Sequence, residues 1–183
     1  MEGENKLLQK INDEVMIKMV TNEVLKSKVD EVIIVTGHDE KKIIKSLKNL
    51  PLKFIKSSNY VHGIGNSISS GIHFLSKRAD GVIIILGDMP KITFKHINIL
   101  VDSFIQNRNE SICVLESNKR QGNPVLFGNF FFDQLKVLSN DYGGKDIIHN
   151  NLDYIIISSI DDSSIFIDID TPAELKNLIE KKN

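Results

Sequence analysis

Only one of the 183 residues is a cysteine, and neither sign of charge predominates. A single cysteine, Cys113, can build neither a disulfide framework nor a cysteine metal site, and its place in the apolar run 112–115 predicts a core residue. Lys and Arg total 23 against 24 Asp and Glu, which gives a net charge of −1. Because the basic residues are scattered rather than clustered in a stripe, nothing indicates a nucleic-acid-binding protein.

Long hydrophobic runs are also missing. No apolar run approaches the roughly 20 residues that a membrane-spanning helix needs. The first residues, Met1 to Lys6, lack the basic-then-apolar order of a signal peptide. There is no internal repeat, low-complexity segment or long linker. We therefore expect a cytoplasmic protein without a membrane partner, in which residues 1–183 form a single domain large enough to bury a sizeable core.

The most informative stretch runs from Gly81 to Pro90. Five consecutive apolar residues at 82–86 show no polar alternation, which predicts a β-strand covered on both faces. The run stops at Gly87 and Asp88, and Pro90 cannot continue a ladder because it has no N–H. Asp88 thus lies at the carboxyl edge of the strand, where open α/β sheets bind ligands and a carboxylate can hold a metal ion that carries phosphates. The alternative is that Asp88 only caps the following helix.

Strand and helix patterns alternate along the rest of the chain. Apolar residues at helical spacing predict helices, and short β-branched runs predict strands. We count about seven strands with helices between them, which predicts a three-layer α/β domain. The predicted strands include 32–35, 52–55, 82–86, 112–115 and 154–157. The first predicted helix ends near residue 28. The other predicted helices cover 39–47, with Asp39 as N-cap, 66–75, 94–107, 130–138, 147–150 and 172–179.

Two glycines precede the predicted helix that starts near Asn66 or Ser67. Gly63 and Gly65 expose backbone N–H groups, and hydroxyls such as that of Ser67 add donors, which suits a nucleotide or a phosphate. Gly-x-Gly is also common in loops that only need flexible glycine, and this spacing is not the dinucleotide fingerprint. Both interpretations stay open from the residues alone.

A polar loop is predicted at 116–122, before the segment Asn123-Pro124. Gly122 lets the backbone approach a neighbour closely, and Asn123 directs an amide side chain. The basic residues Lys119 and Arg120 are either solvated charges or contacts to an anion. A second loop with glycines and a basic residue follows at 141–146.

The C-terminal segment adds two carboxylates before a helix. Asp168 and Asp170 lie two residues apart on an extended segment, so they are expected to point to the same side. Thr171 is the expected N-cap, with Glu174 three residues later as in a capping box. Because Mg²⁺ in phosphoryl chemistry takes oxygen ligands from converging elements, Asp88 and Asp170 would form a site if their segments were neighbours.

Six motifs occur along the chain in one order. They are Lys6-Leu7-Leu8, Val35-Thr36-Gly37-His38-Asp39, Gly63-Ile64-Gly65-Asn66-Ser67-Ile68, Leu86-Gly87-Asp88-Met89-Pro90, Gly122-Asn123-Pro124-Val125-Leu126-Phe127 and Asp168-Ile169-Asp170-Thr171-Pro172. Together they resemble the molybdenum cofactor cytidylyltransferase branch of the nucleotidyltransferase superfamily, a group of MobA-like NTP transferases, and the resemblance covers essentially the whole chain. It implies a three-layer Rossmann-like fold with a mostly parallel sheet, and a Mg²⁺-dependent transfer of CMP from CTP to molybdenum-bound molybdopterin with release of pyrophosphate.

The resemblance also implies roles for individual residues. Asp88 matches the metal-binding aspartate and Asp170 its partner across the site, with Asp168 as a further candidate ligand. Lys6 matches the lysine that contacts the triphosphate and stabilises charge as the α-phosphate is attacked. Asn123 stands where many members have histidine. The residues matched to nucleotide or acceptor contacts are Gly63, Gly65, Asn66, Ser67, Gly87, Gly122 and Asn123.

One departure from the family concerns the start of the chain. Family members have a central β-strand and a glycine-rich loop before the lysine that Lys6 matches, and this chain starts at the end of that motif. We expect either a truncated chain or a wrongly assigned start codon, with about 15–20 more residues upstream, the length of a strand plus a loop. An in-frame stop immediately before Met1 in the gene would exclude the second explanation.

Several functional hypotheses follow from the resemblance. The leading one is CMP transfer to molybdopterin, with a molybdenum hydroxylase as a recipient of the product. A second is a related nucleotidyltransferase that uses GTP or a sugar-phosphate acceptor. A third is a non-catalytic nucleotide- or cofactor-binding chaperone for a molybdenum enzyme. The plainest alternative is an α/β domain whose acidic turns are only helix caps.

Overall fold

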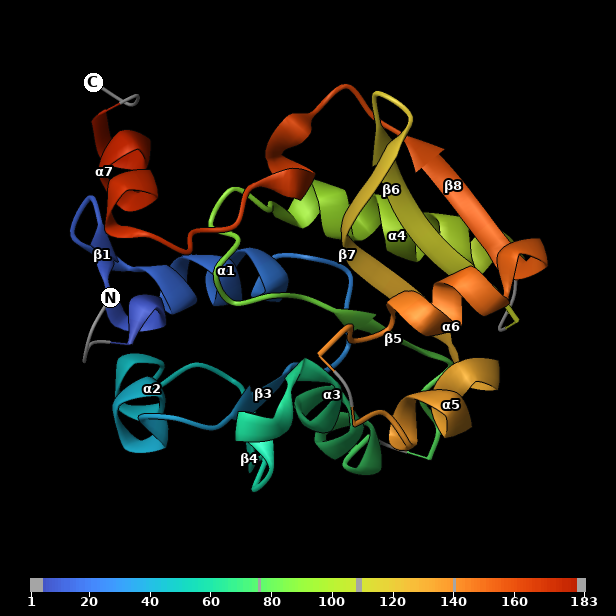
Figure 1. Cartoon of the computed structure of the whole chain (residues 1–183), viewed down its shortest axis with the longest axis horizontal. Coiled ribbons are helices and arrows are strands. Elements are labelled where there is room, and N and C mark those ends of the chain that lie inside the picture. Colours follow the sequence, from blue (N-terminus) through green and yellow to red (C-terminus); the bar gives the residue numbers. More distant parts are fainter. Residues whose placement is uncertain (1–4, 76, 108–109, 140, 181–183) are drawn as a thin grey trace.

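The computed structural model describes residues 5–75, 77–107, 110–139 and 141–180 (Figure 1). Its strands are β1 (Lys10–Ile11), β2 (Glu14–Val15), β3 (Ile33–Thr36), β4 (Lys53–Lys56), β5 (Gly81–Ile84), β6 (Ile112–Ser117), β7 (Arg120–Gly128) and β8 (Ile155–Ser159). Its α-helices are α1 (Met16–Leu25), α2 (Glu40–Ser46), α3 (Ile64–His73), α4 (Phe94–Asn107), α5 (Phe132–Lys136), α6 (Lys145–Asn150) and α7 (Pro172–Glu180). Short 3₁₀ helices are η1 (Lys6–Leu8), η2 (Tyr60–His62), η3 (Asn129–Phe131), η4 (Leu152–Tyr154) and η5 (Ser163–Phe166).

The main sheet has four strands in the order β5-β7-β6-β8. Strands β6 and β8 are parallel, and β7 is antiparallel to both β5 and β6, so three of the four strands share one direction. Strands β3 and β4 form a separate parallel pair, and β1 pairs with β2 in a short hairpin. This arrangement of strands and helices confirms the predicted α/β class.

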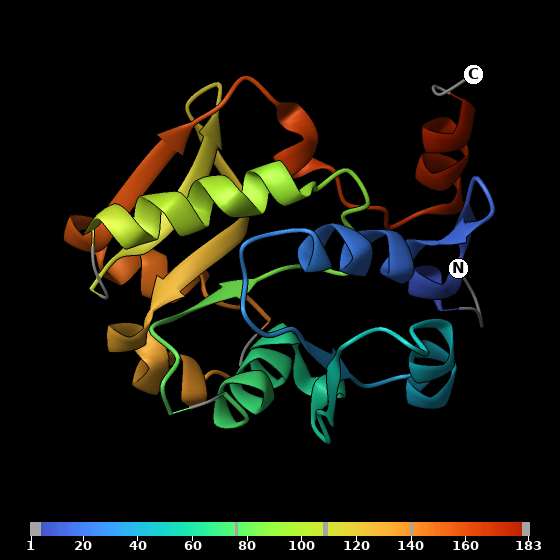
Figure 2. The same ribbon diagram turned by 180° about the vertical axis from the view of Figure 1, so that it is seen from behind.

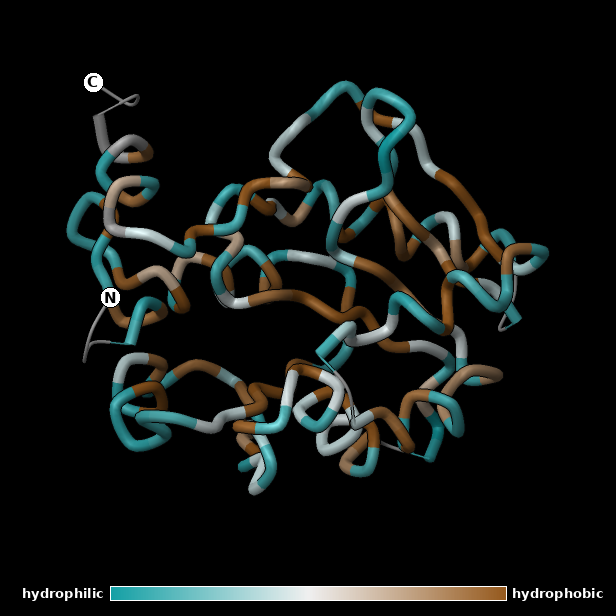
Figure 3. Tube along the Cα trace, in the orientation of Figure 1, coloured by the Kyte–Doolittle hydropathy of each residue, from teal (hydrophilic) through white to brown (hydrophobic). Residues whose placement is uncertain are grey.

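Both faces of the main sheet are covered by helices, which produces the three layers. On β6, Cys113 and Leu115 pack with Leu100 of α4, whereas Ile112 and Val114 face the cluster formed with α3, α5 and α6. Helix α4 lies behind the sheet in Figure 1 and in front of it in Figure 2, opposite α6. The hydropathy colouring shows the strands as the most apolar segments (Figure 3). Alternate residues of a buried strand thus serve two cores, and Cys113 is the core residue that was predicted.

Strand β5 is the predicted central strand, and its environment differs from the prediction in one respect. Val82 and Ile84 pack on one core and Ile83 on the other, so both faces are covered. All four residues of β5 are nevertheless only half-buried. Within the described residues, β5 pairs only with β7, and β3 pairs only with β4, so each has one edge without a partner strand. The open edge explains the residual exposure.

The polar loop predicted at 116–122 is instead the tip of a β-hairpin. Strand β6 continues to Ser117 and β7 begins at Arg120, so the connection has two residues. Asn118 and Lys119 have φ angles of 52° and 62°. Positive φ at both central positions is typical of the tight turns whose twist matches that of paired strands. The prediction failed because polar residues on an exposed hairpin tip resemble those of a loop.

One predicted helix start and one predicted cap also need correction. Helix α3 begins at Ile64, so Gly65 lies in its first turn and only Gly63 precedes it. Asp39 occupies the N-cap position of α2 but makes no side-chain cap bond. Its carboxylate pairs with Lys42 at 2.9 Å and lies 3.2 Å from the His38 ring. By contrast, α4 spans the predicted residues 94–107.

No helix in the described parts of the chain has the length and apolar character that crossing a membrane requires.

Candidate active site

A backbone hydrogen bond brings the C-terminal segment to the end of β5. The Ile169 N–H donates to the Asp88 carbonyl at 3.0 Å. Ile169 is 2% exposed and packs with Ile11 and Met16, which fixes this segment beside α1. Asp170 therefore lies close to Asp88, although 81 residues separate them in the sequence.

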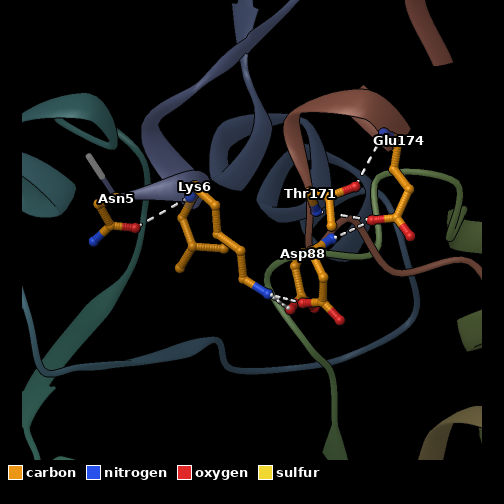
Figure 4. Close-up of polar contacts among 7 residues, drawn as sticks. Asn5, Lys6, Asp88, Thr171 and Glu174 are labelled. Atoms are coloured by element: carbon orange, nitrogen blue, oxygen red, sulfur yellow. Dashed lines mark hydrogen bonds and ion pairs between the residues drawn. The ribbon is translucent and has the colours of Figure 1, made fainter. Parts of the chain in front are cut away.

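Lys6 joins the two carboxylates. Its Nζ lies 2.6 Å from Asp88 Oδ2 and 2.5 Å from Asp170 Oδ1 (Figure 4). The Lys6 helix η1 is capped by Asn5, whose Oδ1 accepts a hydrogen bond from the Leu7 N–H at 3.1 Å. Three distant segments thus converge on one ammonium group, and the structure brings together all three residues that the sequence assigned to catalysis.

The capping box predicted before α7 is confirmed and holds Asp170 in place. Glu174 Oε2 accepts hydrogen bonds from the backbone N–H groups of Asp170 and Thr171, at 2.9 and 2.8 Å. The Thr171 hydroxyl accepts in turn from the Glu174 N–H at 3.2 Å (Figure 4). These hydrogen bonds to backbone donors lower the pKa of Glu174 below its usual value.

The charges in the cluster favour a cation between the carboxylates. Burial of Lys6 disfavours its charged form, but hydrogen bonds to Asp170 and Asp88 outweigh that cost and raise the pKa of Lys6. Asp88 Oδ1 is buried and accepts no hydrogen bond from the described part of the chain. A buried carboxylate oxygen without a donor is a fitting ligand for a hard divalent ion such as Mg²⁺. The donor set therefore fits such an ion.

The carboxylates cannot form a complete metal cage by themselves. Among the described residues, no three His, Cys, Asp or Glu side chains are grouped in a way that could hold a metal ion. Mg²⁺ is commonly bound through one or two carboxylates together with substrate phosphates and waters. Asp88 and Asp170 match that partial set.

A first cavity of about 510 Å³ opens beside Lys6. It extends from the end of β3 to the start of α3, and its lining includes Gly63 and Ser67, two of the residues that the resemblance matched to nucleotide or acceptor contacts. Gly63 has a φ of 111°, a backbone conformation that favours glycine. The remaining lining includes Asn5, Leu7, Ile17, Thr36, Gly37, His38, Tyr60, Ile64 and Asp141.

Two other predicted contacts of this region have structural roles in the fold. Gly65 is buried inside α3. The Asn66 side chain donates to the carbonyls of His62 and Ser139, at 3.0 and 3.3 Å. Neither residue lines the first cavity.

A second cavity of about 570 Å³ lies on the side of β7 and α6. Gly122, Asn123 and Asp168 line it, together with Met89, the neighbour of Asp88. Asp168 thus lies apart from Asp170: it lines this cavity, while Asp170 contacts Lys6. The cause is that residues 167–170 form no regular strand, so alternation does not place the two carboxylates together.

The basic side chains of the second cavity are Arg120, Lys145 and His149. The Arg120 guanidinium carbon stacks 4.6 Å above the centre of the Phe166 ring. The sequence did not predict His149 as a site residue, because a histidine in a short helix carries no signal of its own.

Tyr60, which lines the first cavity, was not predicted as a site residue either. Its ring covers Gly37, where an added Cβ would lie only 2.4 Å from the Tyr60 Cγ.

Gly87 lies against side chains of α1 and η1. A Cβ at this position would lie 2.8 Å from Cδ1 of Ile17 in α1 and 3.4 Å from Cδ2 of Leu7. Glycine therefore lets η1 and α1 approach the end of β5 without a shift of these side-chain ends. This close packing brings Lys6 near Asp88.

Comparison with known proteins gives matches over most of the chain. Residues 1–154 match the family described as the MobA-like NTP transferase domain. The purine catabolism protein PucB of Bacillus subtilis (strain 168) is 29% identical over 181 residues, which cover 94% of this chain and 86% of PucB. A probable molybdenum cofactor guanylyltransferase of Thermococcus sibiricus is 29% identical over 164 residues, covering 86% of this chain and 80% of that protein.

The fold is shared with solved structures. Rv0371C from Mycobacterium tuberculosis H37Rv, crystallised in complex with manganese, is similar at a TM-score of 0.83 and 18% identity. The similarity covers 97% of this chain and 93% of that one.

Proposed function

The chain belongs to the family of MobA-like NTP transferase domains, and from this premise we propose that it transfers CMP from CTP to molybdenum-bound molybdopterin. The family is one of NTP transferases, and a solved nucleotidyl transferase from Methanothermobacter shares the fold at a TM-score of 0.81. One observation carries the proposal: Asp88 and Asp170 converge on a single cation beside two cavities. Lys6 lines the first cavity, and Met89 and Asp168 line the second.

We assign the nucleotide to the first cavity. Its volume of about 510 Å³ lies within the range of small-molecule sites. Gly63 and Ser67 would contact the base and ribose, and Lys6 would neutralise charge on the triphosphate. This assignment places the phosphates next to Asp88 and Asp170.

We assign the acceptor to the second cavity. Arg120, Lys145 and His149 give it the character expected for an anionic acceptor. A phosphate oxygen of the acceptor attacks the α-phosphorus of the nucleotide, the bond from that phosphorus to the β-phosphate oxygen breaks, and pyrophosphate leaves. No covalent nucleophile of the protein is needed, because phosphoryl transfer depends mainly on positioning and charge stabilisation.

Asp88 and Asp170 would hold a divalent cation, and Asp168, which lines the second cavity, is left out of this set. When bound, such an ion supplies charge neutralisation and orientation of the phosphates. The manganese in the Rv0371C structure is consistent with this proposal.

GTP is the second candidate donor. It is favoured by the relative from Thermococcus sibiricus, whose name is that of a molybdenum cofactor guanylyltransferase.

Pyrophosphate release tests the proposal. CTP, GTP and ATP are each incubated with the protein, Mg²⁺ and molybdenum-bound molybdopterin. We expect release with CTP, and a loss on the order of 100-fold or more in the Asp88→Asn variant, because an interaction with transition-state charge is removed. Asp80→Asn, at the opposite end of β5, is the control and should retain activity.

The other outcomes separate the hypotheses. Release with GTP alone would mean that GTP rather than CTP is the donor, and the reaction would still be a nucleotidyl transfer. Nucleotide binding without any pyrophosphate release would favour the non-catalytic chaperone. Activity that is independent of Asp88 would contradict the proposed site.

A further inference from the structure

We propose that Lys6 is a tethered counter-cation that competes with divalent metal ions for the Asp88–Asp170 pair and so couples metal binding to nucleotide binding. The inference rests on the proposed metal-dependent nucleotidyl transfer and concerns the same site. It makes Lys6 an inhibitor of metal binding in the nucleotide-free protein, in addition to its proposed role at the triphosphate.

The two oxygens that Lys6 contacts can share only one cation at a time. Lys6 Nζ touches Asp88 Oδ2 and Asp170 Oδ1 at 2.6 and 2.5 Å. A Mg²⁺ ion shared by these oxygens would sit about 2.0–2.1 Å from each, in the space that the ammonium now fills. Two positive charges at such close range also repel each other strongly. Metal binding by both carboxylates therefore requires Lys6 to leave.

The charge balance predicts the direction of the effect. With Lys6 in place, the two carboxylates and the ammonium carry one net negative charge. Without the ammonium, the pair carries two, and Asp88 is a largely buried group whose side chain is 18% exposed. The Asp170 side chain is 63% exposed, so the burial argument applies to Asp88. Two neighbouring carboxylates, one of them largely buried, favour a nearby cation, so removal of Lys6 should increase the attraction for a divalent ion.

The backbone of Lys6 keeps the competitor at the site. Asn5 caps η1 through the Leu7 N–H and donates from Nδ2 to the His38 carbonyl at 3.3 Å, which ties η1 to the end of β3. A group attached in this way competes at a high effective concentration, in the millimolar range or above for short tethers. Free metal ions must compete for the carboxylates against this high effective concentration of the ammonium.

A bound nucleotide would offset the free-energy cost of moving the Lys6 ammonium away from Asp88 and Asp170. Lys6 lines the first cavity, and Asp141 is the one acidic residue among the described residues around it apart from the cluster itself. An ammonium displaced into an empty cavity loses both of its carboxylate partners. A triphosphate in the cavity would replace them with phosphate oxygens, so metal and nucleotide should bind together better than either does alone.

The test is a Mn²⁺ titration of the whole protein without nucleotide, followed by electron paramagnetic resonance of the free ion. Wild type is compared with Lys6→Met, which keeps an unbranched side chain only one heavy atom shorter and removes its charge. Lys10→Met, on the neighbouring strand β1, is the matched control. We expect Lys6→Met to bind Mn²⁺ at least tenfold more tightly than wild type and Lys10→Met to be unchanged. Equal or weaker binding by Lys6→Met, or no binding by either protein, would overturn the inference.

A nucleotide arm keeps this inference separate from the proposed function. At saturating Mg²⁺, Lys6→Met should bind CTP or GTP at least tenfold more weakly than wild type. If wild type binds and turns over a nucleotide but Lys6→Met gains no Mn²⁺ affinity, the inference is wrong and the function stands. If Lys6→Met gains Mn²⁺ affinity but no nucleotide binds or reacts, the metal competition is right and the proposed function is wrong.

A measurement on wild type covers the case in which the variant does not fold. Nuclear magnetic resonance of protein labelled at the lysine ε-carbon follows the Lys6 side chain directly, with Lys6→Arg used for assignment. We expect its signal to shift with Mg²⁺ and nucleotide together, and to stay in place with millimolar Mg²⁺ alone. A signal that shifts equally with Mg²⁺ alone, or never shifts, would contradict the proposed coupling.

Discussion

Gly122 shows how a single residue near the second cavity serves the fold. An added Cβ would lie 2.6 Å from the Ile165 carbonyl oxygen and 2.8 Å from its Cγ1. A backbone oxygen cannot move aside as a flexible side chain can, so this contact needs glycine. The close approach of β7 to η5 also positions the segment that continues to Asp168 and Asp170.

We predict that Gly122→Ala lowers the free energy of unfolding by about 1–3 kcal/mol, the usual cost of overpacking. Urea unfolding followed by circular dichroism measures the loss. Gly71→Ala in α3 is the control, because its Cβ would meet only Cγ2 of the Val35 side chain, at 3.2 Å. A Gly122→Ala protein as stable as wild type would show that η5 can shift freely, and that Gly122 is not needed for packing.

Helix α4 and the 3₁₀ helix η5 are joined by a hydrogen bond between His96 and Asp162. His96, 5% exposed in the first turn of α4, accepts a hydrogen bond at Nδ1 from the Thr93 N–H at 3.1 Å. This leaves the proton on Nε2, which donates to Asp162 Oδ2 at 3.1 Å. Asp162 also caps η5 by accepting from the Ser164 N–H at 2.8 Å. The contact fixes η5, and hence the approach to Asp168, against the start of α4.

The hydrogen bonds to Asp162 make its contribution to stability depend on pH. Bonds from Ser164, and then from His96, lower the pKa of Asp162. A carboxylate with a lowered pKa stabilises the fold above its unfolded pKa of about 3.9, and this stabilisation disappears as the pH falls through the folded pKa. We predict that Asp162→Asn lowers the free energy of unfolding at pH 7 by up to about 1 kcal/mol, because the pair is partly exposed.

Thermal unfolding of Asp162→Asn between pH 7 and pH 3 checks this prediction. The difference from wild type should be largest at pH 7 and shrink below about pH 4. Asp161→Asn, at the adjacent position, is the control and should unfold like wild type across this range. A pH-independent difference would mean that the carboxylate charge is not what joins α4 to η5.

At the scale of the whole molecule, the candidate site collects residues from both ends of the chain. Lys6 and Asp170 meet at Asp88, at the end of β5. Thr36, the last residue of β3, lines the first cavity together with Lys6, and Asp88 follows the end of β5, whereas β3 and β5 belong to different sheets in the described residues. Binding at the cluster therefore links segments that the sheet itself does not join, and a ligand there should stabilise the whole fold.

We predict that a nucleotide with Mg²⁺ raises the unfolding midpoint. At about 100 times its dissociation constant a ligand adds roughly 2.7 kcal/mol, which corresponds to about 5–10 °C for a chain of this size. A thermal-shift series with CTP, GTP and ATP, each with and without Mg²⁺, measures the effect. Asp88→Asn should lose the part of the shift that depends on Mg²⁺. The absence of a shift with every nucleotide would contradict the assignment of the first cavity.

The sequence by itself determined the elements and the chemical types of the site. The apolar run at 82–86 predicted β5, helical spacing predicted α4 at 94–107, and Thr171 with Glu174 predicted the capping box, because these features depend on neighbours a few residues apart. The family resemblance pointed to the Lys6, Asp88 and Asp170 group. Their roles stay predictions; a site formed by Asp88 and Asp170 was expected if their segments were neighbours, whereas the contact of both with Lys6 was not predicted.

Only the tertiary structure decided which of these residues meet. Lys6 and Asp170 are 164 residues apart, and their contact depends on the Ile169–Asp88 backbone bond and on the packing of Ile17 against Gly87. Asp168 faces a different cavity from Asp170 because its segment is irregular, and alternation holds only in regular strands. The spacing of residues in the sequence predicts on which face of a helix or strand a residue lies, whereas long-range contacts depend on how whole elements pack.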